Sequence, residues 1–281
     1  MLTEQKNTET KTVLLSDLET SFVSFLMQDI FHKVLQIAKL ESNVVIVGEI
    51  GSGKKIIAET IHKNSNRLSK PFVSFYCVDI NETDYKDAFW GQLNFEENQL
   101  TLRYDALEKA ESGVLYLDQF SELSPKYMDQ IIDSIHKGFH QLYRNNQNNK
   151  LKPRIILSFN QESYRDIINT DVWKVLLDKL DPMVIMLPPL RERKEDIPVL
   201  IDHFLEEIKK ANADFKDLGI SSQALSNCFN YSWPGNIRQL KNAILQGAIL
   251  SFGQTIKSEH LPFTINWNLP YKIDDPKGIK G

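Results

Sequence analysis

The stretch NVVIVGEIGSGKKIIAETIH, residues 43–62, contains the segment that decides the fold. Its first six residues form an apolar run typical of a buried β-strand, and residues 56–62 have the apolar spacing of a helix. Between them, the glycines of GEIGSGK (48–54) let backbone N–H groups turn inward at a helix N-terminus, and Lys54 is placed to reach the terminal phosphates of a nucleotide. This order of strand, glycine loop and helix predicts a phosphate-binding loop.

The loop itself supplies most of the predicted nucleotide contacts. These are Gly48, Glu49, Ile50, Gly51, Ser52, Gly53, Lys54 and Lys55. Lys55 stands where such loops usually carry a Ser or Thr hydroxyl for Mg²⁺, so it is either a second phosphate contact or a solvated helix position. The alternative for the whole segment is an ordinary glycine turn with a surface lysine, and the flanking strand and helix favour phosphate binding.

A second apolar run, GVLYLD (113–118), ends in Asp118. A carboxylate at the end of a buried strand beside a phosphate loop is expected to hold Mg²⁺ through water, and its alternative role is to cap the following turn. Gln119 follows, where hydrolytic nucleotide enzymes of this kind place a glutamate. An amide cannot accept a proton from water, and loss of a general base removes ~10²–10⁴ of the rate.

The chain alternates apolar runs with helical or polar segments, which predicts a parallel sheet covered by helices on both faces. The expected strands are 43–48, 71–77, 113–118, 154–160 and 182–188, and Met27 to Ala38 has amphipathic helical spacing. From about Glu195 onward we expect helices only, over 197–211, 221–230 and a third opening at Pro234. The predicted organisation is a flexible tail (1–20), an α/β nucleotide-binding part (21–190), a small helical part (191–265) and a C-terminal tail (266–281).

Composition restricts the other function classes. The formal net charge of −4 provides no basic field for nucleic acid, so we expect no direct DNA binding. Cys77 and Cys228 lack metal-ligand spacing and are expected to be buried free thiols. The N-terminus has no signal-like apolar region and no stretch reaches the length of a membrane span, so we expect a cytoplasmic protein without membrane contact.

Taken together, these motifs resemble the AAA+ domain of bacterial sigma-54-dependent transcription activators, the enhancer-binding proteins, from about Phe25 to Pro262. SGVLYLDQF (112–120) is similar to the Walker B strand of that family, and RIILSFN (154–160) to its sensor I strand ending in Asn160. WPGNIRQL (233–240) is similar to the lid helix that presents sensor II, which would be Arg238. Without the family context, Asn160 would be a strand-end cap and Arg238 a surface charge.

The resemblance implies a P-loop AAA+ fold with a small helical lid, an ATP or ADP ligand with Mg²⁺, and homo- or hetero-oligomers of AAA+ subunits. Three working parts depart from the family pattern. The family contacts sigma-54 through a GAFTGA loop, whereas LNFEENQLTLR (93–103) has no glycine, so we expect that loop to be effectively absent. Gln119 replaces the Walker B glutamate. The arginine-finger positions fall on Trp173 and Lys179, and no arginine occurs between Arg165 and Arg191.

These departures predict a module that binds ATP but hydrolyses it weakly or not at all, acting as a regulatory or assembly component with a transcription-related protein partner. An arginine finger is worth ~10³–10⁵ in phosphoryl transfer, and lysine lacks its planar fork. The alternative is a working ATPase that remodels a target through an atypical loop around Phe95. A third alternative, a relic without nucleotide affinity, is disfavoured by the intact glycine loop. The family's N-terminal receiver and C-terminal helix-turn-helix are not expected in this chain.

Overall fold

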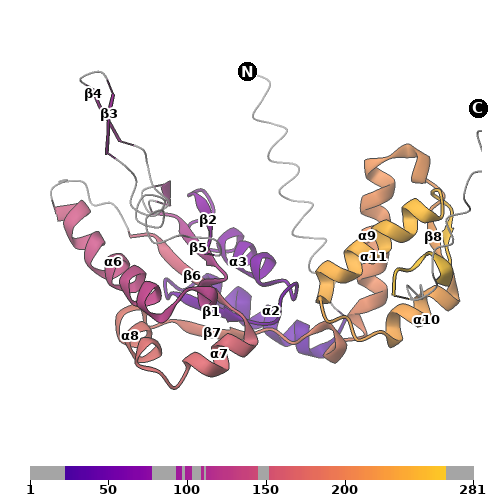
Figure 1. Ribbon diagram of the computed structural model, residues 1–281, viewed down its shortest axis with the longest axis horizontal. Coiled ribbons are helices and arrows are strands. Elements are labelled where there is room, and N and C mark those ends of the chain that lie inside the picture. Colours follow the sequence, from indigo (N-terminus) through magenta and orange to yellow (C-terminus); the bar gives the residue numbers. More distant parts are fainter. Residues whose placement is uncertain are drawn as a thin grey trace, which may run out of the picture. The chain divides into compact units, whose positions relative to one another are not determined.

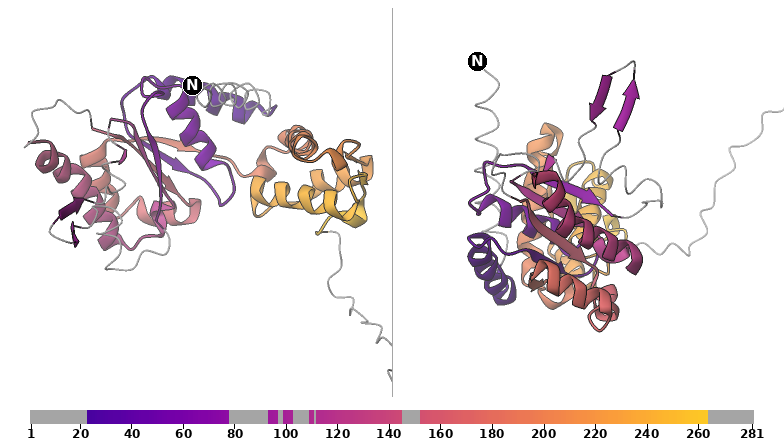
Figure 2. Two further views of the ribbon diagram at one scale, coloured as in Figure 1. Left: turned by 90° about the horizontal axis from the view of Figure 1, so that it is seen from above. Right: turned by 90° about the vertical axis from the view of Figure 1, so that its left-hand side faces the viewer.

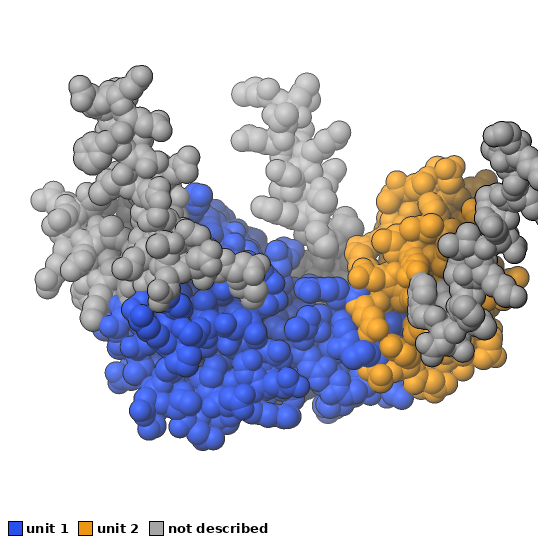
Figure 3. All heavy atoms as spheres, in the orientation of Figure 1, with its two compact units in different colours: residues 1–196, 233–238 blue, residues 197–232, 239–281 orange. Residues whose placement is uncertain are grey.

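The computed structural model describes residues 23–77, 93–96, 99–102, 109–110, 112–144 and 152–263. The chain divides into two compact units, coloured separately in Figure 3. The first contains residues 1–196 and 233–238, and the second contains residues 197–232 and 239–281. The short segment 233–238 therefore belongs with the first unit, although it is far from it in sequence.

A five-stranded parallel sheet forms the centre of the first unit (Figure 1). The strands are β1 (Val44–Val47), β2 (Phe72–Tyr76), β5 (Val114–Asp118), β6 (Arg154–Phe159) and β7 (Met183–Met186), in the spatial order β2-β5-β6-β1-β7. Each lies inside one of the predicted apolar runs, and the parallel sheet flanked by helices is confirmed. The central strands β1 and β6 are buried at every position, which explains why their sequences do not alternate with polar residues.

Helices cover both faces of this sheet. On one face, α2 (Phe25–Ala38) and α3 (Lys54–Lys63) pack against Val44 and Ile46. On the other face, α6 (Pro125–Arg144) and α8 (Asp171–Leu180) pack against Val45 and Val47. The two-residue side-chain period of β1 therefore divides its apolar residues between two cores, and the two views in Figure 2 show the sheet between its helices. The short elements η1 (Phe120–Glu122), α7 (Gln161–Ile167) and η2 (Leu190–Glu192) complete the unit.

The segment expected to have lost the family's loop forms an antiparallel strand pair. β3 (Leu93–Glu96) and β4 (Gln99–Leu102) pair so that Phe95 lies opposite Leu100. Residues 97–98 and Arg103 lie outside the described part of the chain. The segment without glycine thus contains two paired strands.

The second unit is helical with one small exception. Its helices are α9 (Asp196–Ala211), α10 (Ser222–Asn230) and α11 (Asn236–Leu250), with short turns η3 (Ala213–Phe215) and η4 (Ser258–His260). The expectation of helices only was incomplete, because β8 (Gly219–Ile220) and β9 (Thr255–Ile256) form a parallel pair. The fully buried Ile256 anchors this pair in the core, and two residues are too few to give a strand pattern in the sequence.

One predicted boundary moves. α11 begins at Asn236 and not at Pro234. Trp233 and Asn236 both adopt positive φ, 50° and 52°, so the chain turns sharply before the helix starts. Asparagine tolerates this left-handed conformation better than most residues, whereas a buried tryptophan there must be held by its surroundings.

Two negative expectations can be compared with the described residues. None of the helices in these residues is long and apolar enough to cross a membrane. Cys77 and Cys228 are buried free thiols, as predicted. Burial raises the pKa of both thiols, that of Cys228 to about 12, so neither is a reactive thiolate near neutral pH.

Candidate nucleotide-binding site

Lys54 is the central cation of the predicted phosphate loop. It is the first residue of α3, and its side chain is 8% exposed. Its Nζ donates to the carbonyl oxygens of Gly48 at 2.7 Å and Glu49 at 3.0 Å. Burial lowers the pKa of Lys54 to about 8, with Asp118 opposing and Arg238 adding to the shift. The ammonium is therefore held inside the loop by backbone carbonyls.

Two loop glycines are required by their backbone geometry. Gly51 has φ +76°, and a Cβ there would lie 2.3 Å from the carbonyl oxygen of Gly235. Gly53, at the N-cap of α3, has φ +107°. A side chain at Gly51 would thus clash with segment 233–238, which packs directly on the loop and also donates from Ile237 N to Gly51 O at 3.0 Å. Close backbone approach and positive φ therefore explain Gly51, and positive φ alone explains Gly53.

Asn236 connects the phosphate loop to the residues after β7. Its side chain is fully buried, donates to Glu49 Oε2 and Ile50 O, and accepts from Leu190 N at 2.8 Å. Glu49 also receives two hydrogen bonds from the Arg191 guanidinium, at 2.6 and 2.8 Å. The Arg191 bonds hold the pKa of Glu49 below its usual range. The Glu49 carboxylate therefore braces the loop, and its predicted contact with nucleotide stays a prediction.

A buried arginine supports the loop from the other side. Arg193 is fully buried and donates from Nη2 to Ser52 O at 2.8 Å. Its Nη1 lies 4.0 Å from Asp196 Oδ2, and Asp196 also accepts from Val23 N and Ser24 N. Burial lowers the pKa of Arg193 to about 10. The phosphate loop, the start of α2 and the start of α9 therefore share one polar network.

Asp118 and Gln119 lie at the carboxyl end of β5. Asp118 Oδ1 accepts hydrogen bonds from Tyr116 Oη at 2.9 Å and Ser158 Oγ at 2.7 Å. Gln119 adopts a left-handed conformation with φ 57°, and its backbone N–H donates to Ser158 Oγ. The Gln119 side chain makes no hydrogen bond with the residues that the structure describes. The Gln119 N–H of the turn is therefore capped by the Ser158 hydroxyl and not by Asp118, for which capping was the alternative role.

The two predicted sensor residues have uncommitted side chains. Asn160 stands at the N-cap position of α7 but makes no side-chain capping bond, and its backbone N–H donates to Ser121 Oγ at 2.9 Å. Arg238 is exposed, and the Cβ of Arg238 lies 3.0 Å from where a Gly51 Cβ would stand. Neither side chain has a hydrogen-bond or ion-pair partner within the described ranges. Lys55 is exposed, which fits a solvated position.

The predicted finger positions are engaged within their own subunit. Trp173 on α8 is 8% exposed and packs edge-on against Phe159 and Tyr164 in the core. Lys179, on the same helix, is ion-paired with Asp133 of α6. A finger has to extend from its own subunit, so position 173 as placed here does not present a side chain to a neighbour.

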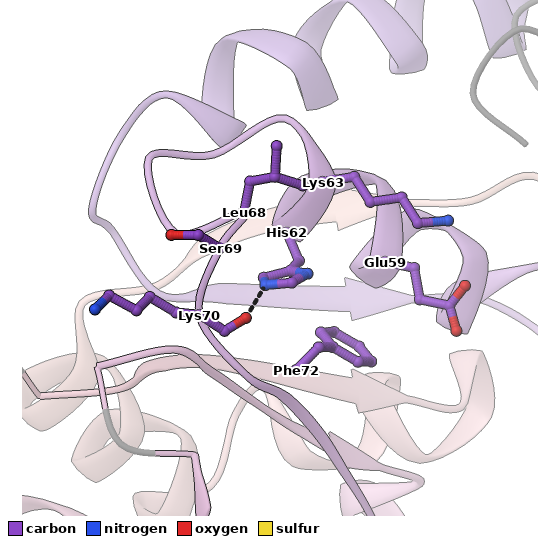
Figure 4. Close-up of a pocket in the computed structure, with 7 residues that line it drawn as sticks. All are labelled: Glu59, His62, Lys63, Leu68, Ser69, Lys70 and Phe72. Atoms are coloured by element: carbon purple, nitrogen blue, oxygen red, sulfur yellow. Dashed lines mark hydrogen bonds between the residues drawn. The ribbon is translucent and has the colours of Figure 1, made fainter. Parts of the chain in front are cut away.

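A hollow between α3 and β2 lies away from this site. It encloses about 370 Å³ and is lined by Glu59, His62, Lys63, Leu68, Ser69, Lys70 and Phe72. Figure 4 shows His62 beside Phe72, hydrogen-bonded to the Lys70 carbonyl. No phosphate-loop residue lines this hollow, which is formed at the C-terminal end of α3, so it is separate from the candidate site.

The residues fit a cation that arrives with the nucleotide. Among the described residues, no group of three or more His, Cys, Asp or Glu side chains could hold a metal ion alone. Asp118 offers one oxygen, Oδ2, that accepts no hydrogen bond from them. Mg²⁺ keeps several waters and is commonly bound by one or two carboxylates plus substrate phosphates. Asp118 would hold such an ion, which would neutralise phosphate charge when bound.

Sequence reasoning missed five residues of this region: Tyr116, Ser158, Arg191, Arg193 and Asn236. Two of them carried a usable signal, because Tyr116 and Ser158 are polar groups inside apolar strand runs. The roles of Arg191, Arg193 and Asn236 depend on contacts between segments 140 or more residues apart, or nearly 50 in the case of Asn236 and Leu190. No local pattern indicates such contacts.

The fold and this loop define a P-loop AAA+ module. Residues 22–186 match the sigma-54 interaction domain family, and residues 191–272 match the AAA+ ATPase lid domain. The chain belongs to the sigma-54 interaction domain family, which confirms the resemblance seen in its motifs.

Relatives and solved structures support this assignment. The chain is 30% identical over 242 residues to the Nif-specific regulatory protein of Azotobacter vinelandii, covering 85% of this chain and 45% of that protein. It is 30% identical over 243 residues to the transcriptional regulatory protein ZraR of Escherichia coli K12, covering 85% and 54%. It thus spans about half the length of these relatives.

Among solved structures, NtrX from Brucella abortus in complex with ATP gives a TM-score of 0.72 at 27% identity, covering 92% of this chain and 61% of NtrX. The same protein in complex with ADP gives 0.71 at 26% identity, covering 93% and 61%.

Proposed function

We propose that the chain binds ATP or ADP at residues 48–55, with Asn160 and Arg238 near the terminal phosphate. The observation that carries this proposal is the buried Lys54 ammonium, whose only hydrogen-bond partners among the described residues are the Gly48 and Glu49 carbonyls. A desolvated lysine at a helix N-terminus attracts phosphate strongly. The complexes of NtrX with ATP and ADP support the same ligand class.

Hydrolysis is proposed to be weak or absent. Gln119 cannot act as a general base, and its side chain is not positioned by any hydrogen bond with the described residues. On α8, Trp173 is in the core and Lys179 is paired with Asp133. The proposed site thus lacks both the general base of its own subunit and the arginine finger that a neighbouring subunit would supply.

In the cell, the chain is proposed to act as a regulatory or assembly subunit in transcription control, in homo- or hetero-oligomers with AAA+ subunits. The relatives named as transcriptional regulators support this role. Mg²⁺ is proposed to accompany the nucleotide at Asp118. The net charge of −4 argues against direct DNA binding, and the missing GAFTGA sequence argues against binding of sigma-54 by this chain alone.

Nucleotide binding and steady-state turnover, measured on the same purified chain, test this proposal. We expect calorimetric binding of ATP and ADP together with turnover below ~0.1 s⁻¹, outside the ordinary enzymatic range. Failure to bind either nucleotide would refute the binding proposal, and turnover near 1 s⁻¹ would refute the weak hydrolysis.

A second candidate is a working ATPase that remodels a target through the β3–β4 hairpin. The observation that favours it is the antiparallel pairing of residues 93–96 with 99–102, in the segment where the family carries its contact loop. Nucleotide-dependent capture of sigma-54 by the wild-type chain, lost on Phe95→Ala, would favour this candidate over the first.

A further inference from the structure

One carboxylate oxygen at the end of β5 is occupied by two hydroxyl groups. Asp118 Oδ1 accepts from both Tyr116 Oη and Ser158 Oγ, at 2.9 and 2.7 Å. A carboxylate oxygen has about two lone-pair sites, so these bonds fill Oδ1. Oδ2 receives no hydrogen bond from the described part of the chain.

The strand geometry explains why these groups meet. Tyr116 and Asp118 are two residues apart and point to the same side of β5. β6 pairs in parallel with β5, with Leu117 opposite Leu157, which brings Ser158 beside Asp118. Tyr116 and Ser158 are fully buried, so their hydroxyls require partners, and both donate to Asp118.

Ser158 also fixes the turn that follows the strand. Its Oγ accepts from Gln119 N at 2.7 Å while it donates to Asp118. Gln119 has φ 57° and ψ 41°, a conformation that is uncommon for a side chain of its size. One hydroxyl thus sets both the orientation of the carboxylate and the path of the backbone beyond it.

Resting on the nucleotide site proposed above, we infer that Tyr116 and Ser158 are positioning residues that restrict Asp118 to a single free oxygen and thereby favour Mg²⁺ over Ca²⁺. Mg²⁺ demands near-ideal octahedral geometry and reluctantly gives up its waters, whereas Ca²⁺ takes carboxylates in one- or two-oxygen modes. With Oδ1 occupied, only Oδ2 is open to a water of Mg²⁺, and Ca²⁺ cannot replace that water by binding the carboxylate through both oxygens. Groups that orient a ligand in this way affect metal affinity about 10–100-fold.

The test measures nucleotide affinity with a fluorescent ADP analogue in EDTA, in Mg²⁺ and in Ca²⁺. The variants are Tyr116→Phe, which removes only an oxygen, and Ser158→Ala, with Ser158→Thr as the hydroxyl-restoring variant. Tyr164→Phe and Ser163→Ala are matched controls, since these hydroxyls do not touch Asp118. Thermal melting establishes that each variant is folded.

We expect Tyr116→Phe and Ser158→Ala each to reduce the Mg²⁺-dependent gain in affinity about tenfold and to reduce the preference for Mg²⁺ over Ca²⁺. Nucleotide affinity in EDTA should stay within about twofold of the wild-type value, and Ser158→Thr should retain the Mg²⁺-dependent gain. Two results would overturn this inference but not the proposed function. They are equal losses of nucleotide affinity with and without metal, and an unchanged Mg²⁺-dependent gain in affinity in folded Tyr116→Phe. A wild-type chain that binds no nucleotide in any condition would overturn the proposed function and this inference with it.

Discussion

The two sides of the candidate site differ in how their side chains are engaged. On the phosphate-loop side, Lys54, Asn236 and Arg193 bind the loop backbone through buried hydrogen bonds. On the cleavage side, the Gln119 side chain has no hydrogen-bond partner in the described residues, and Trp173 is directed into the core. Under the proposed function, holding a nucleotide and cleaving it therefore depend on separate sets of residues. One set can persist while the other changes.

The largest expected effect tests whether Trp173 belongs to the core. Trp173→Ala removes a side chain packed on Phe159 and Tyr164 and should lower the free energy of unfolding by ~3–5 kcal/mol. Urea denaturation followed by circular dichroism measures this. Lys174→Ala, on an exposed part of the same helix, is the control and should leave the free energy of unfolding nearly unchanged. A small loss of stability would show that Trp173 lies at the subunit surface. A large loss would show that an arginine finger cannot be rebuilt at this position.

Next in size is the loss of the phosphate-loop lysine. Lys54→Ala should weaken ATP and ADP binding by at least ~100-fold, because charge-assisted bonds to phosphate are worth ~1.5–3 kcal/mol each. Lys55→Ala, at the adjacent exposed lysine, separates the two roles predicted for that residue: affinity within about threefold of wild type marks a solvated position, and a larger loss marks a second phosphate contact. Isothermal titration calorimetry compares the two. Equal affinity in wild type and Lys54→Ala would remove the phosphate-loop assignment.

A smaller effect is expected from pH. Since burial lowers the pKa of Lys54 to about 8, its charge in the free protein is lost as the pH rises through 8. Phosphate favours the charged form, so affinity should be flat below pH 8 and fall by up to about tenfold per unit above it. The free energy of unfolding should rise over the same range, because between about pH 8 and the ordinary lysine pKa of 10.5 the unfolded chain binds more protons at this residue than the folded chain does.

Calorimetry in buffers of different ionisation enthalpy should show proton uptake on nucleotide binding at pH 9 and little at pH 7. Lys54→Arg retains its charge throughout and should bind with no such dependence. A wild-type affinity that is constant from pH 7 to 9 would show that Lys54 is not the group that titrates.

The smallest expected effect concerns the cleavage side. Gln119→Glu alone should leave ATP turnover within about threefold of wild type, because residues that act as a unit are not additive. If the chain forms rings, the gain in ATP turnover from Gln119→Glu combined with Lys179→Arg should exceed the product of the gains from the two single changes. Gln119→Glu with Lys174→Arg is the control on the same helix. A large gain from Gln119→Glu alone in a coupled ATPase assay would mean that only the base is missing.

Local patterns predicted the elements of the first unit well. The apolar runs at 43–48 and 154–160 became β1 and β6, and the spacing from Met27 to Ala38 became α2. These predictions succeed because buried parallel strands and amphipathic helices are specified by the residues within them. The β8–β9 pair and the start of α11 were missed, since they depend on Ile256 and Asn236 finding partners elsewhere.

The features of the candidate site also fall into two groups, those that local sequence patterns indicate and those that depend on contacts in the folded chain. The sequence by itself determined the phosphate loop, Asp118 at its strand end and the replacement of the glutamate by Gln119, because these follow from residue type and short-range spacing. Only the tertiary structure decided that Glu49 braces the loop through Arg191 and Asn236, that Trp173 is a core residue, and that Ser158 and Tyr116 occupy Asp118. Apart from the Tyr116 contact, hydrogen bonds and packing between distant segments set these roles, and their geometry exists only after the chain has folded.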